Sequence, residues 1–209
     1  MNETETPIGG RFRAAAALAA LGLAAAAPGD RWDFEGDAVG GPAKGFATAV
    51  GRWEVVEDGG SRALAQKAES PKPTFNIAFA EGTSFQDVDV SVRLRAEAGA
   101  IDRGGGLVWR AKDRDNYYIA RYNPLEESLR VYKVEGGKRT QLDHADARGD
   151  GAWHTLRIVM KGRDITGWLD GVRLLVAEDS TFPDAGLIGL WSKADARTSF
   201  DDLTAAPAP

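Results

Sequence analysis

The sequence contains no cysteine, which excludes a disulfide framework, a thiolate metal site and a cysteine nucleophile. Histidine is almost as scarce. His144 lies in the polar stretch "LDHADARGD" and His154 opens "WHTLRI", and neither has the spacing of a metal ligand. We expect both to be surface or edge residues. There is also no G-x-S-x-G nucleophile elbow. The glycines of "RGGGL" are followed by neither a Lys-Ser/Thr pair nor a helix pattern, which excludes a phosphate-binding loop.

No strong excess of one charge is present. The formal net charge is −5, from 26 basic and 31 acidic residues, and the two signs are interleaved along the chain. A nucleic-acid-binding protein needs a clustered basic surface, so nucleic acid is not an expected partner. With 209 residues and 43% hydrophobic content, the chain is long enough for one domain with a full core.

No hydrophobic run is long enough to span a membrane. The longest, Ala14 to Ala27, would reach roughly 21 Å as a helix, against ~30 Å for the hydrocarbon core. Arg11 and Arg13 precede it and small residues end it, a pattern typical of an export signal. The alternative is a disordered alanine-rich leader. We expect a leader at 1–27, a β-sandwich domain at 28–205 and a tail at 206–209, with a periplasmic or extracellular location.

After the leader, no segment carries a convincing amphipathic helix of three turns, and the hydrophobic pattern has a period of two. "FQDVDVSVRLRAE" places Val88, Val90, Val92 and Leu94 on one face, as in a half-buried strand. The Asp-Gly pair of "LDGV" predicts a type I′ hairpin, and "VEGGKR" predicts a second hairpin at its two glycines.

The other predicted strands are short and separated by glycine-rich turns. They are 31–34, 52–56, 63–66, 76–80, 106–110, 117–122, 155–160, 186–191 and 198–203. Strands of this length and spacing predict an all-β fold, a jelly-roll sandwich of two antiparallel sheets.

Aromatic and basic residues are concentrated between Gly104 and Ser128. In the strand 117–122, Tyr118 and Tyr122 fall on one face and Tyr117 and Arg121 on the other. Only one face of each sheet reaches the core of a sandwich. Outward rings beside arginines would suit a sugar, whose flat apolar face lies on a ring while its hydroxyls meet polar groups. The alternative is cross-strand packing, with arginine stems lying over tyrosine rings.

The stretches "DRGGGLVWRAKDRDNYYIARYNPLEESLRVYKVEGGKRTQL", "WHTLRI", "LDGVRLL" and "TFPDAGLIGLWSKADARTSFDDL" resemble, in this order, the bacterial concanavalin A-like or laminin-G-like domains of the 3-keto-disaccharide hydrolase-like family. The resemblance extends from "WDFEG" to "FDDL". It implies a concanavalin A-like jelly roll with a link to carbohydrate, but the activity stays open because lectins, glucanases and binding modules share this fold.

Ordinary glycosidase chemistry requires two carboxyl groups flanking the scissile bond, and no E-x-D-x-E-like strand is present. Asp87 and Asp89 share a face but are better interpreted as part of a solvated strand. A 3-keto sugar has an acidified C2 proton, so elimination needs only one base and a group that holds the enolate oxygen. The candidate base is Glu126 or its neighbour Glu127 in "NPLEES", with Arg121 or Lys133 steadying the oxyanion. The alternative is an ordinary polar turn closed by Asn123.

The resemblance also implies that a structural calcium ion could join the first and last strands, although no cofactor is required. "WDFEG" supplies Asp33 and Glu35, and "SFDDL" supplies Asp201 and Asp202. Carboxylate oxygens are the ligands that calcium prefers, and Glu35 with Asp202 is the candidate pair. Two solvated acidic strand ends are the alternative.

Together these observations predict an exported carbohydrate-engaging sandwich, foremost a glycan-binding module. A hydrolase or lyase acting on glycosides, including 3-keto-disaccharides, and a protein-contacting adhesion module are the alternatives. The position of Trp191 in its predicted strand favours burial in the core. The alternative is that its ring lies at the mouth of a groove, where Lys193 would reach the ligand. The candidate ligand-binding residues are Arg110, Tyr118, Arg121, Asn123, Lys133, Trp191 and Lys193.

Overall fold

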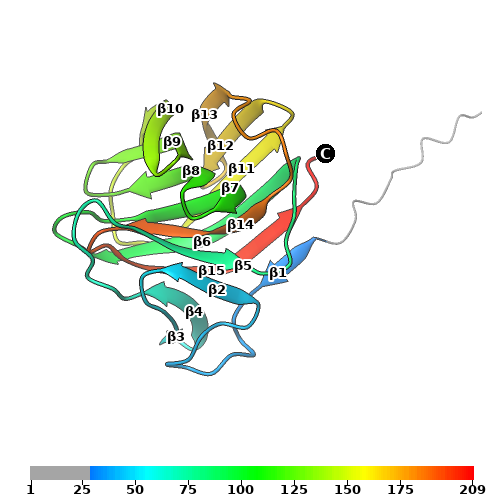
Figure 1. The fold of residues 1–209 in the computed structure, drawn as a ribbon. Helices are drawn as coiled ribbons and strands as arrows, with labels where there is room; N and C mark the ends of the chain where they lie inside the picture. Colours follow the sequence, from blue (N-terminus) through cyan, green and yellow to red (C-terminus); the bar gives the residue numbers. More distant parts are fainter. Residues whose placement is uncertain (1–28) are drawn as a thin grey trace, which may run out of the picture.

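A computed structural model describes residues 29–209, so the expected leader lies outside the described residues. The described chain forms two antiparallel sheets stacked face to face (Figure 1) and contains no helix. The predicted jelly-roll sandwich is therefore confirmed. No helix within 29–209 is long and apolar enough to cross a membrane.

The eight-stranded sheet has the order β13-β12-β11-β6-β15-β4-β3, and β1 also pairs with β15. Its strands are β1 (Asp30–Trp32), β3 (Trp53–Asp58), β4 (Ser61–Gln66), β6 (Val88–Ala98), β11 (His154–Lys161), β12 (Asp164–Leu169), β13 (Val172–Glu178) and β15 (Arg197–Ala206). The seven-stranded sheet has the order β10-β9-β8-β7-β14-β5-β2. Its strands are β2 (Phe46–Val50), β5 (Phe75–Ala80), β7 (Gly105–Asp113), β8 (Asn116–Asn123), β9 (Ser128–Glu135), β10 (Lys138–Asp146) and β14 (Leu187–Lys193).

The main core lies between the two sheets and follows the predicted alternation. In β6, Val88, Val90, Val92 and Leu94 are fully buried while the residues between them are partly exposed. They pack in one cluster with inward residues of β7, β8 and β9 from the facing sheet. Burying each such aliphatic side chain contributes roughly 1.5–3 kcal/mol, so this face fixes the register of the central strands.

Both predicted hairpins are confirmed. Asp170 and Gly171 have φ of 50° and 78° and join β12 to β13, and Gly136 and Gly137 have φ of 56° and 75° and join β9 to β10. Positive φ at both turn positions is what a type I′ turn requires. The sequence did not predict β2, whose "FATAV" is a short edge segment without marked alternation.

A second hydrophobic cluster covers the outer face of the seven-stranded sheet. Its buried members are Ile77, Phe79, Val108, Ala111, Tyr117, Ile119, Tyr132, Val134 and Trp191. This explains why β7, β8 and β9 are buried on both faces rather than alternately. Near one end of this face, the β7–β8 turn (Arg114, Asp115) and the β9–β10 turn (Gly137) meet Pro73, Thr74 and Phe75 around a hollow of about 270 Å³.

The C-terminal strand continues further than expected. β15 includes Ala206, the Ala208 N–H donates to the carbonyl of Asp87, and Lys161 Nζ donates to the carbonyl of Pro209. The expected tail at 206–209 is thus held against the eight-stranded sheet.

Candidate functional site

The alternating side chains of β8 separate into two environments. Tyr118, Ala120 and Tyr122 point into the main core, whereas Tyr117 and Ile119 belong to the outer cluster. Arg121 shares the parity of Tyr117 and stands opposite Gly106 on β7 and Arg130 on β9. The rings and guanidinium groups that the sequence concentrates here are therefore divided between core and outer face.

One group of polar residues gathers on that outer face at the ends of β8, β9 and β14. We call it the arginine site and define it as Asp102, Arg121, Asn123, Glu126, Ser128, Arg130, Tyr132, Arg139 and Lys193. The cross-strand register Arg121↔Arg130, Asn123↔Ser128 and Gln141↔Tyr132 brings these residues together from β8, β9 and β10.

Asp102, in the loop between β6 and β7, is the buried anion of the site. Its side chain is 1% exposed. It accepts hydrogen bonds from Asn123 Nδ2 at 2.8 Å and from Lys193 Nζ at 2.7 Å, and Arg121 Nη1 lies 3.6 Å away. The Asp195 carboxylate fixes the loop by accepting the backbone N–H groups of residues 100 to 102. Asp102 thus anchors one end of three neighbouring side chains.

Glu126 is the exposed anion. The Asn123 amide oxygen accepts the N–H groups of Leu125 and Glu126 and so closes the turn between β8 and β9, as the polar-turn interpretation predicted. This places the Glu126 carboxylate 2.7 Å from Arg121 Nη2 and 3.3 Å from Arg130 Nη2. Partial burial would raise the pKa of Glu126, but the hydrogen bond and charge of Arg121, together with the Arg130 charge, outweigh it and lower the pKa. Glu126 is therefore an ionised anchor for two arginines.

Buried polar atoms without a partner are concentrated in this one place. Within residues 29–209 they are Arg121 Nε and Nη1, Ser128 Oγ, Arg130 Nε, Tyr132 OH and Arg139 Nη1, all on β8, β9 and β10. Each such group costs free energy unless something satisfies it. Four of the atoms are guanidinium nitrogens, which only donate. An acceptor-rich ligand or bound water would satisfy these donors.

Arg139 of β10 lies across the aromatic part of the site. Its guanidinium carbon is 4.2 Å from the ring centroid of Tyr132 and 5.6 Å from that of Phe75. Phe75 in turn packs on Trp191, with their ring centroids 5.4 Å apart. Arginine stems over rings are thus present, as the packing alternative predicted, and Trp191 is fully buried under them on the outer face. Its buried position is the one the sequence favoured, although the cluster is not the inter-sheet core.

The open side of the site faces solvent at Glu126, Arg130 and Lys193, whose side chains are 39%, 32% and 16% exposed. A hollow of about 560 Å³ adjoins this side, lined by Glu126, Glu127, Asp146, Ala147 and Arg148. Of the arginine site, Glu126 is the residue that lines this hollow, and its carboxylate contacts Arg121 and Arg130.

Arg110 lies outside the arginine site, contrary to expectation. The β7–β8 register breaks after Trp109, and Arg110 itself has a φ of 46°. This irregularity turns its side chain toward the end of the sandwich. There its nitrogens donate to the carbonyls of Gln86, Phe182 and Gly162 and to the Asp87 carboxylate. Strand parity could not predict the turn because parity assumes an unbroken strand.

Tyr118 and Lys133 also lie elsewhere, on the inward face. The Tyr118 hydroxyl donates to Asp179 Oδ1 at 2.7 Å, and Lys133 Nζ donates to Asp179 Oδ2 at 3.1 Å and to Thr181 at 2.7 Å. Burial, followed by the hydrogen bond to Asp179, raises the pKa of Tyr118 to about 12. These two residues fix the segment after β13. Lys133 lies on the face of β9 that carries Leu129 and Val131, opposite to the face that carries Arg130, so it does not belong to the arginine site.

The acidic residues proposed for calcium do not share a donor set. Glu35 accepts from the Ser61 hydroxyl at 2.5 Å and from the Arg62 N–H at 2.9 Å, while Asp202 pairs with Arg31 at 2.8 Å and Arg93 at 3.2 Å. No three His, Asp or Glu side chains within 29–209 are grouped so as to hold a metal ion. Protein donors thus surround both carboxylates, and a calcium ion at this place stays a prediction.

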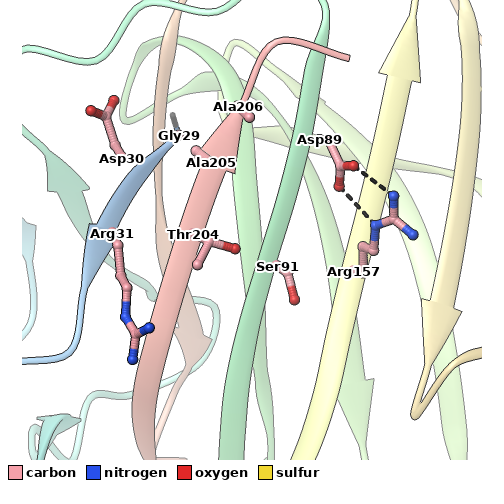
Figure 2. Close-up of a pocket in the computed structure, with 9 residues that line it drawn as sticks. All are labelled: Gly29, Asp30, Arg31, Asp89, Ser91, Arg157, Thr204, Ala205 and Ala206. Carbon is pink, nitrogen blue, oxygen red and sulfur yellow. Dashed lines mark hydrogen bonds and ion pairs between the residues drawn. The ribbon is translucent and has the colours of Figure 1, made fainter. Parts of the chain in front are cut away.

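A different hollow, of about 440 Å³, lies on the outer face of the eight-stranded sheet. Figure 2 shows Asp89 and Arg157 on one side of it and Asp30 and Arg31 of β1 on the other. Arg157 Nε and Nη2 are 2.8 Å and 2.6 Å from the two Asp89 oxygens. The arginine and the carboxylate therefore satisfy each other, and none of the unpaired buried atoms of the described chain lies here.

Sequence reasoning missed five members of the site: Asp102, Ser128, Arg130, Tyr132 and Arg139. Parity in β9 does put Arg130 and Tyr132 on one face, but the signal requires knowing that β9 pairs with β8 in this register. Nothing in the sequence of the 99–104 loop marks Asp102, because its role depends on contacts with distant strands.

Comparison with known proteins places these features in a context. A curated relative, the "Extracellular exo-alpha-L-arabinofuranosidase" of Streptomyces chartreusis, is 29% identical over 142 residues, which are 66% of this chain and only 16% of that protein. Among solved structures, the carbohydrate binding module CBM66 from Bacillus subtilis has a TM-score of 0.67 and 21% identity, covering 78% of this chain and 95% of that one. A Bacillus subtilis protein of unknown function with a galectin-like fold has a TM-score of 0.65 and 13% identity, covering 88% and 97%.

The structural neighbours agree with the sandwich and, at these identities, establish the fold alone. The family comparison covers much more of the sequence: residues 30–205 match the 3-keto-alpha-glucoside-1,2-lyase-like domain. The resemblance inferred from the sequence motifs is thereby confirmed, and the chain belongs to the family of 3-keto-alpha-glucoside-1,2-lyase-like domains.

Proposed function

We propose that this protein binds carbohydrate through the arginine site on the outer face of its seven-stranded sheet. The observation that carries the proposal is the set of buried, unpartnered donors on β8, β9 and β10. A saccharide presents many acceptor oxygens on a flat apolar body, and the site combines guanidinium donors with the rings of Tyr132 and Phe75. The arabinofuranosidase relative and the carbohydrate binding module support the same conclusion.

The family supports a second candidate function, elimination on a 3-keto-glucoside. Glu126 is the exposed carboxylate of the site and would remove the C2 proton, while Arg121 or Arg130 would hold the enolate oxygen. Collapse of the enolate would form the C1–C2 double bond and break the bond from C1 to the glycosidic oxygen, which would leave with a proton taken from water or from the protonated Glu126. The lowered pKa of Glu126 weakens it as a base, because a carboxylate paired with two arginines holds a proton poorly. Binding without turnover is therefore the primary proposal.

Export is part of the same proposal. The Arg11 to Ala27 pattern predicts an export signal, and the Streptomyces relative is described as extracellular. A periplasmic or extracellular domain would meet polymeric and oligomeric glycans there. Contact with a protein surface, as in an adhesion module, is the outcome to expect if no sugar binds.

The test is a calorimetric titration of the protein with a panel of neutral and acidic glycans and with a 3-keto-disaccharide. Each mixture is then analysed for reaction products. We expect binding without product, and an affinity reduced at least tenfold by Arg130→Gln, because the variant removes a solvent-facing donor of the site. Arg157→Gln, which alters an arginine on the opposite sheet, is the matched control and should bind normally. Equal affinities for the two variants would contradict the proposal. Release of product that is lost in Glu126→Gln would establish the elimination instead.

A further inference from the structure

The charges of the arginine site do not balance. Four cationic side chains, Arg121, Arg130, Arg139 and Lys193, surround only two anions that pair with them. Glu126 pairs with Arg121 and Arg130, and Asp102 pairs with Lys193 and, at longer range, Arg121. Glu127 and Asp146 line the adjoining hollow but make no ion pair with the four cations within residues 29–209. The site therefore keeps an excess of positive charge.

Arg139 is the cation without an acidic partner. It makes no ion pair with any residue of 29–209 within 4 Å, and its Nη1 is buried without a hydrogen-bond partner. Burial lowers the pKa of Arg139 and the Arg121 charge acts in the same direction, and together they outweigh the opposing effects of Tyr132, Asp102 and Glu126. The guanidinium of Arg139 contacts the face of the Tyr132 ring, but a ring supplies no acceptor that satisfies the buried Nη1.

Among residues 29–209, Arg110 is the buried arginine that is not left in this condition. Arg110 is as deeply buried as Arg121, yet its Nε, Nη1 and Nη2 all have protein acceptors. The chain can therefore satisfy a buried guanidinium where the role is structural. Unsatisfied guanidinium nitrogens occur on three adjacent strands of one face, where Arg121, Arg130 and Arg139 surround Tyr132.

We propose that the ligand of the arginine site is a saccharide carrying an oxyanion group, with the carboxylate of a uronic acid as the first candidate, and that Arg139 recognises this group. This inference rests on the proposed carbohydrate-binding function. Guanidinium groups bind carboxylates through paired, charge-assisted hydrogen bonds, and an anion here would satisfy the free nitrogens and the uncompensated charge together. A neutral hydroxyl would satisfy the nitrogens only. The sugar body would lie on the ring side of the site, toward Tyr132 and Phe75.

The experiment compares glucuronate with glucose, and includes glucose 6-sulfate to distinguish a carboxylate from a sulfate. Titration at low salt should give at least tenfold tighter binding of one of the two anionic sugars than of glucose. The difference should shrink as sodium chloride is raised, because salt screens the interaction. Tighter binding of glucose 6-sulfate than of glucuronate would support recognition of an oxyanion group and would identify that group as a sulfate. Equal binding of all three sugars would overturn this inference while leaving carbohydrate binding intact. Binding of none would overturn both proposals.

Variants test whether Arg139 is the residue that recognises the anionic group of the sugar. Arg139→Gln should remove the preference for the anionic sugar, and Arg139→Lys should keep part of the preference because the charge remains. Arg157→Gln should behave as wild type. A preference that survives in Arg139→Gln, in protein whose melting temperature and circular dichroism match wild type, would overturn the role of Arg139.

Discussion

At the scale of single residues, the same side-chain type has opposite roles in this protein. Arg110, Arg121 and Arg157 are all arginines on or beside a strand, and their positions in the sequence do not distinguish them. Arg110 is enclosed by carbonyl groups, Arg157 is matched by Asp89, and Arg121 retains two nitrogens without a partner. What separates a structural arginine from a binding arginine is the balance of acceptors around it.

We expect the buried carboxylate of Asp102 to contribute strongly to the free energy of unfolding. Asp102→Asn keeps the side-chain shape but leaves Lys193 and Arg121 without their buried carboxylate. Removing one member of a buried ion pair typically costs 3–5 kcal/mol, and because Lys193 is partly exposed we expect a loss of about 3 kcal/mol in the free energy of unfolding. Urea denaturation measures it.

The matched control for Asp102→Asn is Asp184→Asn. Asp184 faces solvent and lies 3.8 Å from the half-exposed Lys112, an arrangement that contributes roughly 0–1 kcal/mol. Similar stabilities for the two variants would mean that Asp102 is not the anchor of the site.

At the scale of the element, hydrophobic alternation predicted the strands and the two glycine turns predicted the hairpins, because both signals are local. The alternation of β6 can be read from its sequence alone. In β7, β8 and β9 the sequence does not show which face reaches the core, because both faces are apolar and the outer one is covered by residues from β5, β10 and β14. The candidate site was predicted in part, at Arg121, Asn123, Glu126 and Lys193. The positions of Arg110 and Asp102 depend on a break in register and on a loop, which no periodic pattern reveals.

A histidine at one end of β11 connects two loops and gives a pH-dependent prediction. His154 Nδ1 lies 2.7 Å from Asp170 in the β12–β13 turn, and Nε2 lies 2.8 Å from Asp150 in the loop after β10. The Tyr122 hydroxyl is 3.3 Å from Nε2. Burial would lower the pKa of His154, but the hydrogen bonds of Asp170 and Asp150 outweigh it and raise the pKa above its ordinary value of 6.5.

The protonated form is thus favoured by folding. Its contribution to the free energy of unfolding is fully present below pH 6.5 and is lost as the pH rises through the higher pKa of the folded protein. Urea denaturation across this range should show the decrease for wild type and a flatter profile for His154→Gln. His144→Gln, which removes an exposed histidine on β10, should keep the wild-type profile. Identical pH profiles for wild type and His154→Gln would contradict the claim that protonated His154 stabilises the folded protein through Asp150 and Asp170.

At the scale of the whole molecule, the two outer faces of the sandwich are chemically different. The outer face of the eight-stranded sheet carries charges that pair with one another, as in Asp89 with Arg157 (Figure 2). The outer face of the seven-stranded sheet carries its own hydrophobic cluster and, beside it, the arginine site with its free donors. Within residues 29–209, the unpartnered buried donors thus lie on one of the two outer faces, which is the face we propose for the ligand.

The most direct test of this asymmetry is to map the bound sugar by NMR, following the side-chain Nε–H signals of the arginines and the indole N–H signal of Trp191 during titration with glucuronate. We expect the signals of Arg121, Arg130 and Arg139 to move while those of Arg110 and Arg157 do not. Movement of the Arg157 signal with an unchanged arginine site would contradict it, because the ligand would then lie on the opposite face of the sandwich.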